Sequence, residues 1–157
     1  IKPLDLHDVT FAAPAVGGVH RARSYAIHFN KEMVICDKYR KRPNEISAMT
    51  VIGDVTGRNV IICDDIIDTG NTLANASDLM LSKGAKSVRA LITHPVLSGK
   101  AYENIENSSL TEVVVCDTIP LKKTSPKIKV LSVAELFATA IRNMYEHKSI
   151  TSLFLNN

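Results

Sequence analysis

Short apolar runs alternate with stretches of helical periodicity along almost the whole chain. The runs predict strands at Val9–Pro14, Met33–Asp37, Asn59–Asp64, Ser87–Thr93, Glu112–Asp117 and Lys129–Leu131. The periodic stretches predict helices at Gly18–Phe29, Leu73–Lys83, Lys100–Asn107 and Val133–Glu146. Repeated strand–helix–strand units are typical of an α/β fold with a doubly wound, mostly parallel sheet covered on both faces. No linker or repeat interrupts them, so residues 1–157 are predicted to form one domain, with ligands at the carboxyl ends of the strands.

The composition places the protein in a general class. Of the 157 residues, 45% are hydrophobic, and the formal net charge is only +3. The charge gives no reason to expect nucleic acid as a partner, and no apolar run approaches the ~20 residues of a membrane span. The three cysteines, Cys36, Cys63 and Cys116, lie in apolar runs without metal-binding spacing, which indicates reduced core thiols. We therefore expect a cytoplasmic protein that binds neither nucleic acid nor membranes.

The third predicted strand ends in acidic residues and opens into a small polar turn. Asp64 and Asp65 repel each other, so they are expected where sugar hydroxyls, a metal or water compensate their charge. The turn that follows consists of Asp68, Thr69, Gly70, Asn71 and Thr72. Its backbone N–H groups, its two hydroxyls and the positive end of the next helix can cradle a phosphate. A solvated strand end explains the acidic pair, and an N-capping turn explains Asn71 or Thr72, but neither explains the combination, which predicts a sugar-phosphate site.

A second glycine-containing loop follows the first predicted strand. It consists of Ala15, Val16, Gly17 and Gly18. Paired glycines let a backbone approach anionic oxygens closely, so this loop is a candidate for binding an anion. The alternative is an ordinary strand-to-helix turn.

The densest cluster of basic residues lies in Tyr39–Ser47 and just before it, where Pro43 and many charges predict an exposed loop. Lys38 and Arg40 belong to this cluster, together with Lys41 and Arg42. Such a loop can close its cations over a polyphosphate, although it can also be merely solvated. His94 ends another strand, where a structural role is the simpler interpretation.

Several segments together resemble the carboxy-terminal half of ribose-phosphate pyrophosphokinases, the enzymes that make phosphoribosyl pyrophosphate. The matching segments, in the order of the family, are Ala13–Arg23, Asp37–Val55, Cys63–Thr72, Thr93–Gly99, Val115–Pro120 and Ser149–Phe154. The Cys63–Thr72 motif alone would indicate only the wider phosphoribosyltransferase group, whereas the other segments make the assignment specific.

The resemblance implies a type I phosphoribosyltransferase fold, ribose 5-phosphate and ATP as substrates, Mg²⁺ as cofactor, and a homo-oligomer. The anomeric hydroxyl of the sugar would attack the β-phosphorus of ATP. By motif, Asp64 and Asp65 would meet the ribose hydroxyls and magnesium-linked oxygens, and Asp68–Thr72 would hold the 5-phosphate. Lys38 and Arg40 would be the catalytic cations, and Ala15–Gly18 the pyrophosphate loop. Ser149, Thr151 and Phe154 match a C-terminal segment that contributes to an allosteric phosphate or ADP site between subunits.

Two departures from the family pattern change the expectation. The family also has an amino-terminal domain with much of the ATP site and a metal-binding histidine, which this chain does not contain, so the chain alone is expected not to turn over ATP. Ala15 stands where the pyrophosphate loop has a magnesium-binding aspartate, and a methyl group cannot ligate a hard cation. The main alternative is therefore a non-catalytic regulatory or associated subunit. A base-specific phosphoribosyltransferase and a receiver-type signalling domain are further alternatives.

Overall fold

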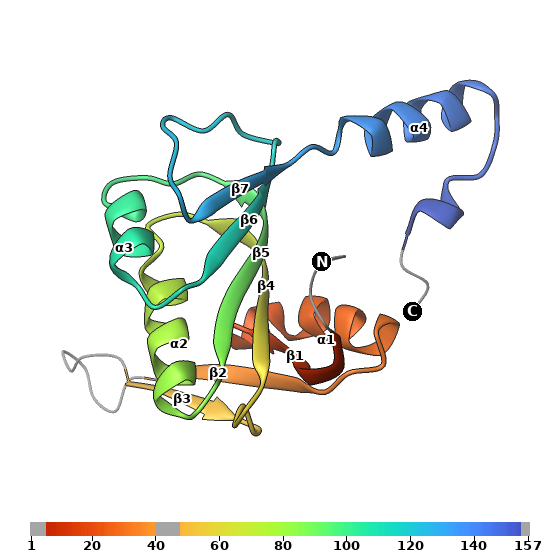
Figure 1. Ribbon diagram of the computed structural model, residues 1–157. Coiled ribbons are helices and arrows are strands. Elements are labelled where there is room, and N and C mark those ends of the chain that lie inside the picture. The colour runs from red at the N-terminus through yellow and green to blue at the C-terminus, as the bar shows by residue number, and fades with distance from the viewer. Residues whose placement is uncertain (1–5, 40–47, 155–157) are drawn as a thin grey trace.

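The computed structural model describes residues 6–39 and 48–154, and their framework is one seven-stranded sheet (Figure 1). The strand order is β3-β2-β1-β4-β5-β6-β7. The strands are β1 (Val9–Ala13), β2 (Met33–Tyr39), β3 (Ala48–Ile52), β4 (Asn59–Ile67), β5 (Ser87–Pro95), β6 (Glu112–Cys116) and β7 (Ile128–Leu131). All neighbouring strands are parallel except β2 and β3, which pair antiparallel. The predicted mostly parallel sheet is confirmed.

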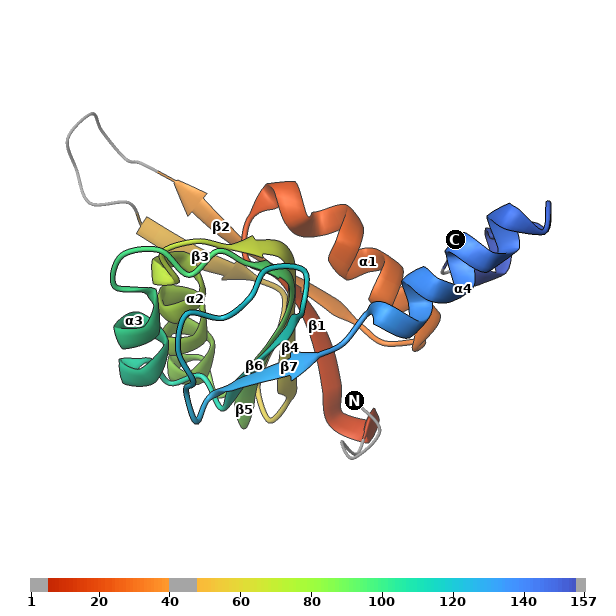
Figure 2. The same ribbon diagram turned by 90° about the horizontal axis from the view of Figure 1, so that it is seen from above.

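Helices lie on both sides of this sheet (Figures 1 and 2). The α-helices are α1 (Val19–His28), α2 (Asn71–Ser82), α3 (Ala101–Asn107) and α4 (Ala134–Tyr145). Short 3₁₀ helices are η1 (Leu6–Asp8), η2 (Val16–Gly18) and η3 (Thr151–Leu153). The larger core lies between the sheet and α2 with α3, and it includes the fully buried Ile62 and Met80. A smaller core lies under α1, where Phe11 is fully buried against Tyr25 and Phe29.

The sequence pattern located every helix and strand in the described residues except β3 and the three 3₁₀ helices, with ends shifted by a few residues. The missed strand, β3, is five residues long and pairs with β2 at the edge of the sheet. Tyr39 was expected in an exposed loop but is the last residue of β2, so that prediction is wrong. Residues 40–47, the rest of the expected loop, lie outside the described residues.

The expectation of helices on both faces holds only in part. Over β5, β6 and β7 the α1 side of the sheet carries no helix within the described residues, because α4 stands clear of the sheet (Figures 1 and 2). No residue of α4 is buried, and Phe137 and Ile141 are 59% and 65% exposed. Cys116, at the end of β6, is consequently only partly buried, which corrects the prediction that all three cysteines are core residues.

The strands end at different heights at the carboxyl edge. Parallel pairing between β1 and β4 stops at Ala12 and Ile62. Pairing between β4 and β5 continues to Ile67 and Pro95. The last five residues of β4 therefore have β5 beside them but not β1, and this step leaves room for a site.

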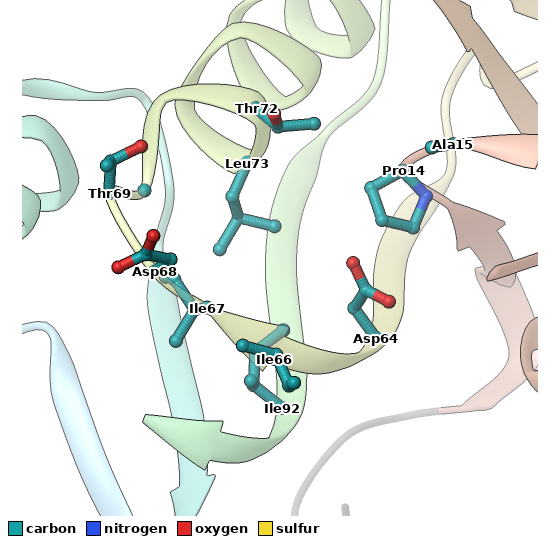
Figure 3. Close-up of a pocket in the computed structure, with 11 residues that line it drawn as sticks. Pro14, Ala15, Asp64, Ile66, Ile67, Asp68, Thr69, Thr72, Leu73 and Ile92 are labelled. Atoms are coloured by element: carbon teal, nitrogen blue, oxygen red, sulfur yellow. The ribbon is translucent and has the colours of Figure 1, made fainter. Parts of the chain in front are cut away.

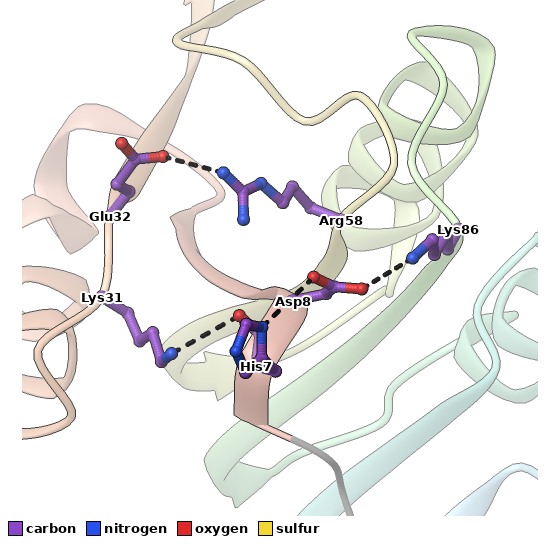
Figure 4. Close-up of polar contacts among 6 residues, drawn as sticks. All are labelled: His7, Asp8, Lys31, Glu32, Arg58 and Lys86. Carbon is purple, nitrogen blue, oxygen red and sulfur yellow. Dashed lines mark hydrogen bonds and ion pairs between the residues drawn. The ribbon is translucent and has the colours of Figure 1, made fainter.

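The opposite, amino edge of the sheet is tied by charged residues that directly precede strands (Figure 4). Lys86 Nζ lies 2.7 Å from Asp8 Oδ2, and Arg58 lies 3.8 Å from Glu32. The hydrogen bond from Lys86 and its positive charge lower the pKa of Asp8. These groups are exposed, so their contribution to stability is small. Each pair connects the starts of two strands that have one other strand between them, β1 with β5 and β2 with β4, far from the carboxyl edge.

Among the residues that the structure describes, no helix combines the length and the apolar character needed to span a bilayer.

Candidate functional site

The two loops singled out in the sequence meet at the carboxyl edge, around a cavity of about 300 Å³ (Figure 3). Pro14 and Ala15, which follow β1, line one side of the cavity, and Asp64 of β4 lies beside them. Asp68, Thr69, Gly70 and Thr72 line the opposite side, as Figure 3 shows for the three that it labels. The step between β1 and β4 thus opens where both candidate anion loops begin.

The acidic pair in β4 is bridged by one cation, Arg21 of α1. Its Nη1 lies 3.1 Å from Asp64 Oδ1, and its Nη2 lies 2.9 Å from Asp65 Oδ2. Burial raises the pKa of Asp64, and the adjacent Asp65 adds to the shift. Burial also acts to raise the pKa of Asp65, but hydrogen bonding with Asp64 and the charge of Arg21 outweigh it, so that this pKa is lowered. The charge of Arg21 thus favours the anionic form of both carboxyl groups, but burial outweighs it at Asp64.

The start of α2 presents hydrogen-bond donors to the cavity. Gly70 precedes the helix with φ +76°, a left-handed conformation that costs glycine little. No side chain caps the helix there, and the first N–H groups of any α-helix lack partners within the helix. Thr69 and Thr72 place hydroxyls at the same cavity. This end of the cavity therefore offers N–H and O–H donors together with the positive end of the helix dipole.

Ser98 and Asn104, which the sequence pattern did not identify as site residues, hold this turn in place by hydrogen bonds. Ser98 donates hydrogen bonds to Asp68 from its hydroxyl to the carboxylate and from its backbone N–H to the carbonyl. The side-chain amide of Asn104 donates to the carbonyl of Thr69 at 2.8 Å. Asp68 thus serves as an anchor of the turn. Leu97 and Gly99, on either side of Ser98, both have positive φ angles and form a tight turn. Gly99 is the residue in the sequence that indicates such a turn.

The loop after β1 forms η2 and packs against the acidic pair. A Cβ at Gly18 would lie 3.7 Å from Asp64 Oδ1, so the loop backbone and that carboxylate are close. Val16 is 65% exposed, and Gly17 is open to solvent. Ala15 contributes a methyl group at the cavity wall. The structure therefore brings Ala15 and Gly18 of the predicted loop next to Asp64, whereas Val16 and Gly17 face solvent.

The described residues do not form a protein-held metal centre. They contain no group of three or more His, Cys, Asp or Glu side chains that could hold an ion. Asp64 and Asp65 already share a guanidinium, and Ala15 offers no side-chain oxygen. This donor set does not fit a resident Mg²⁺, which requires about six oxygen ligands in near-octahedral geometry.

The remaining predicted residues are only partly covered by the structure. Lys38 lies near the end of β2, toward the same edge, but its side chain and the whole of Arg40 lie outside the described residues. Ser149 and Thr151 hydrogen-bond to each other at 2.9 Å beside η3. Phe154 is 65% exposed and lines a groove against α1 with Gly17 and Arg21. The C-terminal segment therefore faces the start of α1 across this groove and lies outside the cavity.

Comparison with known proteins places this geometry in a family. The family model described as "Phosphoribosyl synthetase-associated domain" matches residues 21–155. The chain belongs to this family.

Two curated relatives of this phosphoribosyl synthetase-associated chain are ribose-phosphate pyrophosphokinases. It is 52% identical to the ribose-phosphate pyrophosphokinase of Wolinella succinogenes over 155 residues, covering 99% of this chain and 50% of the relative. It is 54% identical to that of Helicobacter hepaticus over 154 residues, covering 98% of this chain and 50% of the relative. The chain thus spans about half the length of the curated relatives it matches.

A solved structure agrees with the sequence matches. The phosphoribosylpyrophosphate synthetase from Mycobacterium smegmatis superposes with a TM-score of 0.81 at 34% identity, covering 89% of this chain and 46% of that one. An adenine phosphoribosyltransferase gives a TM-score of 0.55 at 22% identity over 69% of this chain and 66% of its own, which concerns the fold alone. The predicted type I phosphoribosyltransferase-like fold of this family member is confirmed.

Proposed function

We propose that this chain provides the ribose 5-phosphate half of a ribose-phosphate pyrophosphokinase. In that reaction the β,γ-diphosphoryl group of ATP passes to the anomeric hydroxyl of ribose 5-phosphate, and phosphoribosyl pyrophosphate and AMP are formed. The observation that carries the proposal is a single cavity with the Asp64 carboxylate at one end and the uncapped start of α2 at the other; Asp65 is joined to Asp64 through Arg21 but does not line the cavity. Carboxylates accept hydrogen bonds from sugar hydroxyls, and N–H groups at a helix start bind phosphate.

Different residues of the site are proposed to bind different parts of the two substrates. Asp64 and Asp65 orient the sugar, and the Asp68–Thr72 turn fixes the 5-phosphate, so that the anomeric oxygen is held in one place. Lys38, Arg40 and the Ala15–Gly18 loop are proposed to face the diphosphoryl group. Most of the rate enhancement then comes from positioning and charge neutralisation. Magnesium is expected to arrive with the ATP phosphates, because the described residues do not fit a resident ion.

The binding half of the proposal is tested by calorimetry with ribose 5-phosphate, with ribose and inorganic phosphate as comparison ligands. We expect ribose 5-phosphate to bind much more tightly than either part. Thr72→Val removes one hydroxyl at the phosphate end and should weaken binding roughly 10-fold or more, the value of one hydrogen bond to a charged group. Thr111→Val, the same change at the amino end of β6, is the matched control and should leave binding unchanged. Equal affinity for ribose and ribose 5-phosphate would overturn the proposal.

A second candidate function is a non-catalytic subunit that binds the sugar phosphate and regulates a partner of the same family. Ala15 at the cavity wall and the guanidinium on the acidic pair favour it. The chain alone is proposed not to transfer the diphosphoryl group. Phosphoribosyl pyrophosphate formation by the full-length protein, before and after Ala15→Asp, separates the two candidates. Activity that appears only in the variant identifies the regulatory role.

The cytoplasmic location, the homo-oligomer and the allosteric role of Ser149, Thr151 and Phe154 are part of the same proposal. Sedimentation of the full-length protein with and without inorganic phosphate or ADP tests the last two together. An assembly that is unchanged by substitution of these three residues, with unchanged effector response, would remove them from the proposal.

A further inference from the structure

The acidic pair at the sugar end of the cavity already has a cation of its own. Arg21 is one-third exposed and reaches from α1 across the loop after β1 to both carboxylates. Each of its two terminal nitrogens contacts a different aspartate, at 3.1 Å and 2.9 Å. A planar guanidinium is suited to this two-pronged contact, because its donors are fixed in a fork. Adjacent like charges that would otherwise repel are thereby held together.

A divalent cation would have to compete for the same oxygens. The Asp64 Oδ1 atom accepts both from Arg21 and from the backbone N–H of Asp65, at 3.1 Å and 3.0 Å. No third acidic, histidine or cysteine side chain in the described part of the chain stands ready to complete a metal site. Mg²⁺ sheds its water shell reluctantly and needs near-ideal octahedral geometry. A metal ion that displaced the guanidinium would gain two carboxylate ligands, but the two carboxylates would lose their charge-assisted hydrogen bonds to Arg21.

We propose that Arg21 is the resident cation of the Asp64–Asp65 pair and takes the place of a divalent metal ion there. Arg21 is a positioning residue: it holds both carboxylates in one orientation and leaves them able to accept further hydrogen bonds, since a carboxylate has several acceptor sites. Where the proposed function holds, ribose 5-phosphate binds to this cavity without a divalent cation.

The direct test uses Mn²⁺ alone, with no sugar, and follows free Mn²⁺ by electron paramagnetic resonance. The wild-type chain should bind it weakly. Arg21→Gln exposes two adjacent carboxylates and should bind Mn²⁺ at least about tenfold more tightly, which corresponds to removing one competing charge-assisted hydrogen bond. Adding Asp64→Asn to that variant should abolish the gain, which locates the ion at the pair. Arg21→Lys keeps a positive charge but cannot make the forked contact, so its Mn²⁺ affinity should fall between those of the wild type and Arg21→Gln.

Arg89→Gln is the matched control. Arg89 is also partly buried and lies 3.1 Å from a single carboxylate, Glu112, in the neighbouring strand β6. Its removal exposes one carboxylate only and should create no Mn²⁺ site. Thermal unfolding checks that each variant is folded. If Arg21→Gln does not fold, Mn²⁺ binding by the wild type and by Arg21→Lys still tests the proposal. Tight one-to-one Mn²⁺ binding by the wild type overturns it.

The second readout is calorimetry with ribose 5-phosphate in EDTA and in Mg²⁺. The wild type should show the same affinity within about twofold, whereas Arg21→Gln should bind at least about tenfold more tightly with Mg²⁺ than without it. Wild-type binding that requires Mg²⁺, or no Mn²⁺ gain in Arg21→Gln, overturns the role of Arg21. Absence of sugar-phosphate binding under every condition, with the Mn²⁺ results as expected, overturns the proposed function and leaves the role of Arg21 intact.

Discussion

Gly70 lies at the phosphate end of the cavity, and substituting it by alanine tests the construction of that end. Its φ of +76° lies in the left-handed region, where a non-glycine residue costs roughly 1–2 kcal/mol. The new Cβ would also lie 3.3 Å from the backbone carbonyl oxygen of Ala101, which cannot move without shifting α3. We therefore expect Gly70→Ala to lower the free energy of unfolding by about 2 kcal/mol or slightly more. For a chain of this length, that corresponds to a Tm lower by roughly 4–8 °C.

Gly57→Ala measures the loss of stability caused by the left-handed backbone alone, without the close contact that a Cβ would make at Gly70. Gly57 has φ +68°, but a Cβ there would have nothing within 4 Å. In urea denaturation, the free energy of unfolding of Gly57→Ala should therefore fall only by the cost of the left-handed backbone, about 1–2 kcal/mol. Ribose 5-phosphate affinity should fall at least about tenfold for Gly70→Ala and stay unchanged for Gly57→Ala. The reasoning is refuted if Gly70→Ala unfolds within about 0.5 kcal/mol of the wild type, or if both variants lose affinity equally.

Three further outcomes can be measured on the same chain. Phe11→Ala should lower the free energy of unfolding by about 3–5 kcal/mol in urea, because its ring is fully buried between two other aromatic rings. Phe154→Ala, at a ring that is 65% exposed, should change it by no more than about 0.5 kcal/mol. Burial raises the pKa of Cys63 to about 12, so its reactive thiolate stays scarce until the pH nears that value; mass spectrometry after iodoacetamide treatment at pH 8 should find Cys116 labelled well before Cys63. Labelling in the reverse order would contradict the burial seen here. Ser98→Ala removes the hydroxyl that braces the phosphate turn and should weaken ribose 5-phosphate binding several-fold in calorimetry, while a variant with wild-type affinity would show that the brace is dispensable.

Periodicity predicted the sheet well because buried parallel strands and amphipathic helices carry strong, repeated patterns. It missed β3, since a five-residue edge strand beside a charged stretch has too few buried positions to form a pattern. It also identified the apolar stripe of α4 without its surroundings: spacing tells which side of a helix is apolar, but not what that side packs against.

The site was predictable to the extent that it lies in continuous motifs. The Ala15–Gly18 and Asp64–Thr72 segments each follow a strand, and adjacent parallel strands bring their ends together. Arg21, Ser98 and Asn104 were not singled out, because each acts across the fold on residues between 30 and 44 positions away. Such contacts depend on how α1, α3 and the turn after β5 pack, which no local pattern encodes.

The step at the carboxyl edge has a consequence for how the protein can change. The cavity exists because β4 and β5 run on to Ile67 and Pro95 after β1 has ended its pairing at Ala12, and not because large core residues were replaced by small ones. Its depth is thus determined by strand register, and the core residues Ile67, Leu73 and Ile92 form part of its lining. The lining of the cavity and the core are therefore one structure, so a substitution in the phosphate turn is expected to change the stability of the molecule and its affinity for a ligand together.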